Sequence, residues 1–180
     1  IKIMEKQSIE LELKIDDDYR KSNENQKQRY FYPLNQETNF KINKFFRTIT
    51  KEKSHSSKII NVKGRNFKIE NFYEGVARFD FNDLCNQNLG AEDYLEIIQA
   101  CKFITLDNIP QFNDINSNQQ QRFITLIDII YDKNIPLAVT AEQNIDQFTS
   151  SRLLENSFKR TISRLYELTS EERNNEARVL

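Results

Sequence analysis

Residues 103–140 read FITLDNIPQFNDINSNQQQRFITLIDIIYDKNIPLAVT. The first apolar run, at 103–106, is followed by Asp107 and stopped by Pro110, a pattern typical of a buried strand that ends in a carboxylate. A second apolar run, at 135–140, predicts another buried strand. Two such strands separated by a helix form a βαβ unit with a parallel pair.

The segment between the two strands predicts that helix. Residues 116–121, NSNQQQ, are Asn/Gln-rich and predict a small loop, and the helix follows at 122–132. Its apolar residues recur at helical spacing and predict a wide, nearly buried stripe: Phe123, Leu126, Ile127, Ile130 and Tyr131. The fold class is therefore α/β.

Alternation of apolar and polar residues predicts further strands earlier in the chain. It occurs over 9–15, over 59–69 and over 76–81. Within 59–69 the alternation is interrupted at Gly64-Arg65, which predicts the turn of a β-hairpin.

Residues 16–39 are mostly polar and predict a surface excursion. An aromatic run at 30–32, which Pro33 closes, predicts one short edge strand inside it. A short helix is expected at 40–49, followed by a Lys/Ser/His loop at 50–58.

Two helices complete the expected elements. Residues 91–101 place apolar residues at helical spacing behind an acidic first turn, which the helix dipole favours. The last helix is expected at 157–169, and beyond Ser170 the composition turns charged, so we expect fraying there.

Composition limits the classes of function. The 180 residues, 38% hydrophobic, suffice for one sizeable domain. With 26 basic and 27 acidic residues the net charge is −1, which gives no support to a nucleic-acid or anionic-membrane partner. No run approaches the roughly 20 apolar residues that span a bilayer, so we expect a soluble protein of the cytosol or matrix.

Cysteine and histidine are too sparse for a metal or disulfide framework. Cys85 and Cys101 have no second pair, and the single histidine, His55, lies far from both. Both cysteines are expected in the core, and His55 is assigned no role.

The segment FKRTISRLYEL, at 158–168, carries the most informative polar residues. At 100° per residue, Arg160 and Arg164 lie on one side of the helix, opposite the apolar positions. Two guanidinium groups on one edge match the oxygens of a phosphate, so the pair is a candidate clamp for a nucleotide's terminal phosphate. The simpler interpretation is a solvated face in which Arg164 pairs with Glu167.

Two carboxylates are weaker candidates. Asp107, at a strand end, is where an α/β protein places a metal or nucleotide ligand, but a turn cap before Pro110 is the preferred interpretation. Asp128 could act as a base, although an ion pair with Arg122 or Lys133 is more in keeping with its neighbours.

A phosphate-binding loop is absent from these residues. The chain has three glycines, Gly64, Gly75 and Gly90, and none begins the spacing G-x-x-x-x-G-K-[ST]. Because the chain also begins at Ile1 rather than Met, we expect a truncated or processed molecule.

Several ordered segments resemble the ZapE-type family of AAA+ ATPases, which includes bacterial cell-division proteins and mitochondrial relatives. They are IDDDYR at 15–20, VKGR at 62–65, ARFDFNDLCNQNLGAEDYLEIIQACKFITLDNIP at 77–110, RFITLIDIIYDKNIPLAVTAE at 122–142 and FKRTISRLYEL at 158–168. The chain departs from the family pattern at Gln121 and Leu168, and the stretch 21–58 matches no part of it.

The resemblance implies an ATP hydrolase that uses ATP and Mg²⁺ and can form homo-oligomers. It also implies a role with a cell-division or membrane-associated protein, in the cytoplasm and peripheral to the inner membrane, or a role in protein quality control in mitochondria. By motif position, Arg160 or Arg164 would be the second-sensor arginine that reads the γ-phosphate. The loop that grips ATP would lie upstream of Ile1, so these 180 residues alone should neither bind the cofactors nor hydrolyse ATP.

The resemblance also implies a division of the chain. Residues 1–15 would be the end of an AAA+ core helix and strand, and 16–75 an inserted β-rich excursion. Residues 76–170 would be the C-terminal α/β part with the arginine helix, and 171–180 a frayed tail.

Two other classes of function compete with the ATPase. The first is a non-catalytic interaction module that docks a partner through 21–58 and an exposed Tyr30-Phe31-Tyr32 run. The second is a single-stranded nucleic-acid binder that stacks bases on the same aromatics beside Arg29, but the mixed flanking charge disfavours it, and no nucleic-acid partner is expected.

Overall fold

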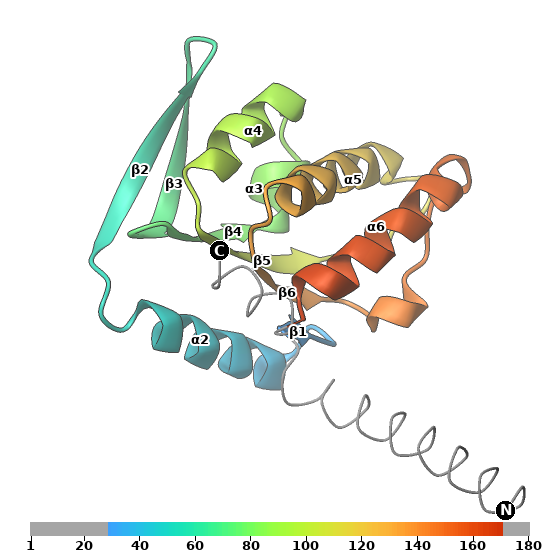
Figure 1. The fold of residues 1–180 in the computed structure, drawn as a ribbon. Coiled ribbons are helices and arrows are strands. Elements are labelled where there is room, and N and C mark those ends of the chain that lie inside the picture. Colours follow the sequence, from blue (N-terminus) through green and yellow to red (C-terminus); the bar gives the residue numbers. More distant parts are fainter. Residues whose placement is uncertain (1–28, 171–180) are drawn as a thin grey trace, which may run out of the picture.

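The computed structural model describes residues 29–170, which form one mixed α/β unit (Figure 1). Its elements, in chain order, are β1 (Tyr30–Phe31), α2 (Gln36–Thr50), β2 (His55–Val62), β3 (Arg65–Tyr73), β4 (Val76–Asp80), α3 (Phe81–Cys85), α4 (Ala91–Gln99), β5 (Phe103–Ile109), α5 (Ser117–Asp132), β6 (Leu137–Ala141), two short 3₁₀ turns η1 (Ile145–Gln147) and η2 (Arg152–Leu154), and α6 (Glu155–Leu168). The strand predicted at 9–15 and the tail beyond 170 lie outside the described residues.

A single sheet joins all six described strands in the order β1-β6-β5-β4-β3-β2. The four strands β1, β6, β5 and β4 are parallel to one another, whereas β3 is antiparallel to β4 and β2 is antiparallel to β3. The parallel part places the carboxyl ends of β4, β5 and β6 at one edge of the sheet, where α/β proteins commonly place polar sites.

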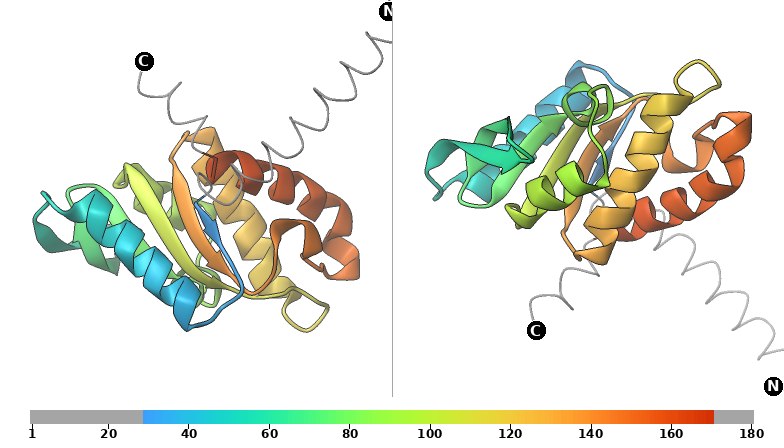
Figure 2. Two further views of the ribbon diagram at one scale, coloured as in Figure 1. Left: turned by 90° about the horizontal axis from the view of Figure 1, so that it is seen from below. Right: turned by 90° about the horizontal axis from the view of Figure 1, so that it is seen from above.

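The sheet lies between two layers of helix. Helix α2 covers one face, and α3, α4, α5 and α6 cover the other, as the two views of Figure 2 show from opposite sides. Arg78 of β4 and Phe103 of β5 face α2, where they contact Phe46 and Phe45. The central apolar side chains of β5 and β6 are fully buried, and the main core cluster lies between the sheet and the layer of α3, α4, α5 and α6.

The βαβ unit predicted at 103–140 is confirmed, since β5 and β6 are parallel and α5 connects them. The loop predicted at 116–121 is wrong, because α5 already begins at Ser117. Gln120 is fully buried, and its side-chain amide donates to Ser150 Oγ while its carbonyl accepts from Ser151 N. A buried helix face can accommodate a glutamine whose side-chain amide and carbonyl are both hydrogen-bonded. The polar composition of NSNQQQ could not show that Gln120 has such partners.

The predicted hairpin is also confirmed, in β2 and β3. Lys63 and Gly64 both have positive φ, the geometry of a two-residue hairpin turn.

The loop predicted at 50–58 is wrong in its second half, because β2 starts at His55. Helix α2 starts earlier than expected, at Gln36, since the Asn35 side chain accepts from Thr38 N and caps it.

The strand predicted at 76–81 ends one residue early. Asp80 caps α3 by accepting from Asn82 N, and Phe81 becomes the first residue of that helix. Helix α3 therefore starts directly at the carboxyl end of β4, on the side of the sheet where the carboxyl ends of β5 and β6 also lie.

The two ends of the described region meet. Arg29 N donates to Thr169 O at 2.8 Å, and Val139 N donates to Arg29 O at the same distance. The first residue before β1 is thus bonded both to the central sheet and to the segment that follows α6. No helix in the described region is both long enough and apolar enough to cross a membrane.

Candidate functional site

Helix α6 carries the arginine pair that the sequence singled out. Its apolar side is buried, with Phe158, Leu165 and Leu168 each no more than 3% exposed. Arg160 and Arg164 are one turn apart on another side, where α6 packs against α5. The predicted separation of the two arginines from the apolar face is therefore confirmed.

One carboxylate on α5 holds both arginines. Arg164 Nη1 lies 2.5 Å from Asp128 Oδ1, and Arg160 Nη2 lies 3.4 Å from Asp128 Oδ2. The Arg164 and Asp128 side chains are 22% and 25% exposed, whereas that of Arg160 is 61% exposed. Arg160 is thus more accessible than Arg164, and its contact with Asp128 is longer.

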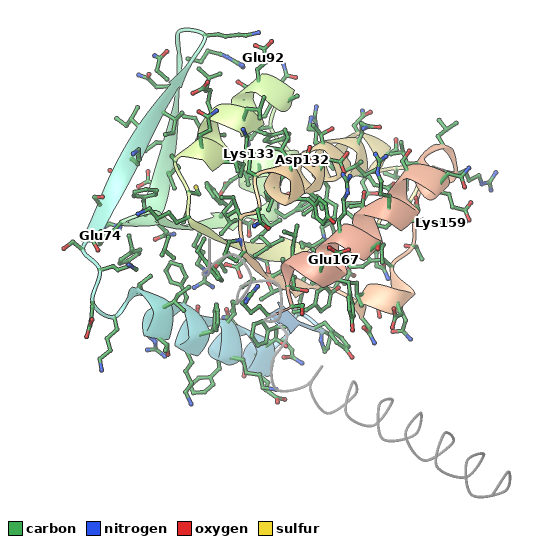
Figure 3. The ribbon with its side chains drawn as sticks, viewed as in Figure 1. Glu74, Glu92, Asp132, Lys133, Lys159 and Glu167 are labelled. Atoms are coloured by element: carbon green, nitrogen blue, oxygen red, sulfur yellow. The ribbon has the colours of Figure 1, made fainter. Side chains whose placement is uncertain are left out.

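Arg164 has a further partner that fixes its orientation. Its guanidinium carbon lies 4.7 Å from the centre of the Tyr131 ring, a cation–π contact. Tyr131 in turn donates its hydroxyl to Glu167 Oε2 at 3.0 Å. Figure 3 places Glu167 near the carboxyl end of α6 and Lys159 near the amino end of that helix, so the arginines lie between these two labelled residues.

These contacts correct two interpretations made from the sequence. Asp128 pairs with Arg160 and Arg164 rather than with Arg122 or Lys133, and Arg122 donates instead to the Cys85 carbonyl. The carboxylate found beside Arg164 is Asp128, on a neighbouring helix, and not Glu167 within its own helix. Two guanidinium groups thus share the Asp128 carboxylate, and Glu167, which accepts from Tyr131, adds a second carboxylate at the seam between α5 and α6.

Asp107 lies elsewhere, at the carboxyl end of β5. Its Oδ2 accepts from Arg78 Nε at 2.6 Å, and its Oδ1 accepts from Thr140 Oγ1 at 3.3 Å. Both side chains of the Arg78–Asp107 pair are less than a fifth exposed. The turn cap preferred from the sequence is therefore wrong, and Asp107 is a half-buried partner of a cation.

Arg78 is a residue that the sequence analysis missed. Besides Asp107, it donates to Asn43 Oδ1 at 2.8 Å and lies over the Phe46 ring, so it connects the sheet to α2. The sequence could have predicted on which face of the sheet Arg78 lies, because the alternation over 76–81 places it opposite Ala77 and Phe79.

The cysteines lie in the core as expected. Cys85 and Cys101 are buried and unpaired, and burial raises the pKa of both thiols. His55 is exposed and contacts the Glu70 carbonyl and the Tyr73 ring. Within residues 29–170 no three His, Cys, Asp or Glu side chains gather in a way that could hold a metal ion.

The aromatic run at 30–32 is not the exposed platform that the competing functions require. Tyr30 is 7% exposed and donates its hydroxyl to the Gln143 carbonyl, and only Tyr32, at 45%, is open to solvent. Arg29 is 4% exposed and donates to the carbonyls of Leu137 and Leu168. Stacking of bases on this run beside Arg29 is therefore contradicted.

Comparison with known proteins decides the family. The sequence profile of the AFG1-like ATPases matches residues 1–176. The chain belongs to the AFG1-like ATPase family. The resemblance to ZapE-type AAA+ ATPases is thereby confirmed, and the α/β fold agrees with part of an AAA+ domain of this family.

Individual relatives of this AFG1-like chain agree with the profile. It is 25% identical to the cell division protein ZapE of Escherichia coli over 155 residues, which are 86% of the chain and 41% of that protein. It is 33% identical over 90 residues to lactation elevated protein 1 homolog B of Danio rerio, covering 50% of the chain and 18% of that relative. An uncharacterised protein of Schizosaccharomyces pombe is 27% identical over 150 residues, 82% of the chain and 33% of its own length.

The AFG1-like chain thus spans less than half the length of these relatives. No solved structure gives a significant match to it. The matched region includes β4 to β6 and α6, and so contains both the arginine helix and the carboxylate that holds it.

Proposed function

We propose that these residues are the C-terminal portion of a longer ATPase of the AFG1-like family and that α6 senses the γ-phosphate of its ATP. The observation that supports this role is the Asp128 carboxylate shared by two arginines. Arg164 makes the short contact with Asp128, whereas Arg160 lies farther from that carboxylate and is mostly exposed, so it is accessible to a further anion. A phosphate oxygen is a partner of suitable charge and geometry for the second guanidinium.

The contacts support different roles for the two arginines. Arg160, 61% exposed and 3.4 Å from Asp128, is the group that would contact phosphate. Arg164, held by Asp128 and the Tyr131 ring, would position the carboxylate and the face of the helix. Arginine stays protonated throughout the physiological range, so the sensor would respond to the presence of phosphate and not to pH.

ATP and Mg²⁺ would be held largely by residues outside these 180, because no G-x-x-x-x-G-K-[ST] segment occurs among them. In a longer protein, the phosphate-binding loop would present the nucleotide to α6. By analogy with the cell division protein ZapE, we propose a cytoplasmic role in cell division or protein remodelling, next to the inner membrane and in a homo-oligomer.

The test compares MgATP binding and hydrolysis by the 180-residue chain and by a longer protein that carries the phosphate-binding loop upstream. In the longer protein, Arg160→Ala should lower kcat by about 10²-fold while MgATP still binds. Lys159→Ala is the matched control, because Lys159 is the exposed cation next in sequence and the charge change is the same. Arg164→Ala should lower kcat as well, together with the stability of the α5–α6 seam.

Equal activity of the Arg160→Ala and Lys159→Ala proteins would rule out phosphate sensing by Arg160. Hydrolysis of ATP by the 180-residue chain itself would contradict the proposal that the nucleotide is held from outside it. The competing function, a non-catalytic interaction module, could not use Tyr30, which is buried, although Tyr32, Leu34 and Phe40 of the expected surface are exposed.

A further inference from the structure

Strands β3 and β4 separate along most of β3. Only Asn71, Phe72 and Tyr73 of β3 pair with β4, through Arg78, Ala77 and Val76. The rest of β3 pairs with β2 alone, as part of the hairpin that rises away from the sheet in Figure 1. From Arg65 to Glu70, one side of β3 therefore has no neighbouring strand among the residues that the structure describes.

A groove of about 600 Å³ occupies this separation. We call it the β3 groove. Its lining consists of residues 65–71 on one wall, 78–80 at the base, and Asp83, 87–89 and Asp107 on the other wall. In Figure 3, Glu74 lies at the turn where β3 meets β4, and Glu92 lies beside the far end of the hairpin.

The ladder between β2 and β3 indicates which backbone groups face the groove. A two-residue turn with both φ positive closes on a hydrogen-bonded pair, which here is Val62 and Arg65. Hydrogen-bonded and non-hydrogen-bonded pairs then alternate along the hairpin. Asn66 and Lys68 fall at non-hydrogen-bonded positions, opposite Asn61 and Ile59. Their backbone N–H and C=O groups point away from β2 and into the β3 groove.

The charges of the groove are not balanced. Its three cations each have an acidic partner: Arg65 pairs with Asp93, Lys68 with Glu70, and Arg78 with Asp107. Asp80 accepts from Asn82 N and from the side-chain amide of Asn108, and Asp83 accepts from Asp80 N. In the described region neither carboxylate has a cationic partner. Negative charge thus remains without a counter-charge where the groove meets α3.

We propose that the β3 groove binds an extended peptide segment of a protein partner, which adds a strand to the open side of β3. The backbone groups of Asn66 and Lys68 would bond to the peptide backbone, which is the usual basis of strand addition. A Lys or Arg of the peptide would pair with Asp80 and Asp83. A nucleic acid does not fit this description, because the free charge in the groove has the same sign as phosphate. The proposal does not depend on the phosphate-sensing role of α6.

The experiment begins with a phage-displayed library of random nonapeptides selected on the 180-residue chain. Enriched peptides should contain Lys or Arg among alternating apolar residues. Backbone hydrogen exchange, measured with and without a synthetic copy of an enriched peptide, should show slower exchange at Asn66 and Lys68. Slower exchange at Ile59 and Asn61 instead would place the peptide on the outer edge of β2 and overturn the proposal.

Two proline variants provide a matched comparison. Lys68 and Ile59 lie opposite each other in the ladder, and each has an N–H that the hairpin itself does not use. Lys68→Pro removes the N–H that faces the groove and should weaken peptide binding by about tenfold. Ile59→Pro removes the corresponding N–H on the other edge of the hairpin and should leave the affinity within about twofold. Lys68→Ala, which removes the cation paired with Glu70 but keeps the N–H, controls for the lost charge and should not weaken binding.

A second pair of variants changes charge without disturbing the backbone. Asp80→Asn retains the helix cap, because asparagine caps as well as aspartate. Asp80→Asn combined with Asp83→Asn should weaken binding of a basic peptide by about tenfold and reduce its dependence on salt. Enrichment of acidic peptides, the absence of any enriched peptide, or equal binding by the two proline variants would overturn the proposal.

Discussion

Arg29 and Leu168 are 139 positions apart in the sequence, and Arg29 Nη2 donates to the Leu168 carbonyl at 2.9 Å. The same guanidinium donates through Nε to the Leu137 carbonyl at 3.0 Å and lies over the Phe103 ring. One buried cation thus satisfies carbonyls at the start of β6 and at the end of α6. A cation is also favoured there because the carboxyl end of a helix carries partial negative charge.

Replacement of this cation tests its structural role. Arg29→Met should lower the free energy of unfolding by about 2–3 kcal/mol, because it leaves buried carbonyls without their donor. Urea denaturation followed by circular dichroism measures the change. Arg47→Met, on the exposed side of α2, is the control and should change stability by less than about 0.5 kcal/mol. Equal stability of the two variants would contradict the anchoring role of Arg29.

Because Asp128 contacts Arg164 more closely than Arg160, removal of the two arginines should lower the stability of the fold by unequal amounts. Arg164→Ala should cost about 1–3 kcal/mol of stability, because it removes a half-buried ion pair and the contact with Tyr131. Arg160→Ala should cost less than about 0.5 kcal/mol, as for other exposed pairs. A double-mutant cycle with Asp128→Asn isolates each coupling energy. A coupling to Arg160 as large as that to Arg164 would mean that Arg160 is structural.

Stability should decrease at alkaline pH. Burial raises the pKa of Cys101 from 9.0 to about 12, and also raises the pKa of Cys85, Tyr30 and Tyr94. A raised folded-state pKa stabilises the fold below the unfolded-state value, and this contribution is lost as pH rises through the folded-state value. The urea midpoint should therefore be level up to about pH 8.5 and fall between about pH 9 and pH 12.

The cysteine contribution to this decrease can be separated from that of the tyrosines. In a Cys85→Ala, Cys101→Ala variant, the fall should begin about one pH unit later, where tyrosines ionise in the unfolded chain. Coincident onsets in the two proteins would show that the thiols do not contribute.

The three glycines should respond differently to alanine. Gly75 has φ +96°, and an added Cβ would lie 3.0 Å from Lys102 Cγ, whereas Gly64, at φ +79°, has no neighbour within 4 Å. Gly64→Ala should cost about 1–2 kcal/mol from backbone strain alone, and Gly75→Ala should cost more because Lys102 must also move. Gly90, which lacks a positive φ, should tolerate alanine with a much smaller loss. Thermal unfolding of the three variants gives the order.

Local patterns were sufficient to predict the βαβ unit and the hairpin. Both depend on neighbours in sequence, namely the apolar runs at 103–106 and 135–140 and the turn at Gly64. The errors occurred where a distant contact overrode composition. NSNQQQ is polar enough for a loop, yet the buried amide of Gln120 is satisfied by residues 150 and 151, and the helix extends through it.

The candidate site could be predicted only in part. The spacing of Arg160 and Arg164 placed them on one side of α6, but the spacing could not reveal Asp128, because the two helices meet only in the folded protein. The β3 groove had no signal in the sequence. The alternation over 59–69 predicts a strand, but it could not show that the pairing of that strand with β4 stops at Asn71 and Arg78.

The bond between Arg29 and Thr169 makes residues 29–170 a unit whose entry and exit coincide. Such a unit can be transplanted into a surface loop of an unrelated host without forcing the host's chain ends apart. It can equally be cut elsewhere and rejoined at that point, giving a permuted chain with the same architecture. Both rearrangements would keep the α5–α6 seam and the β3 groove together within one transferable segment.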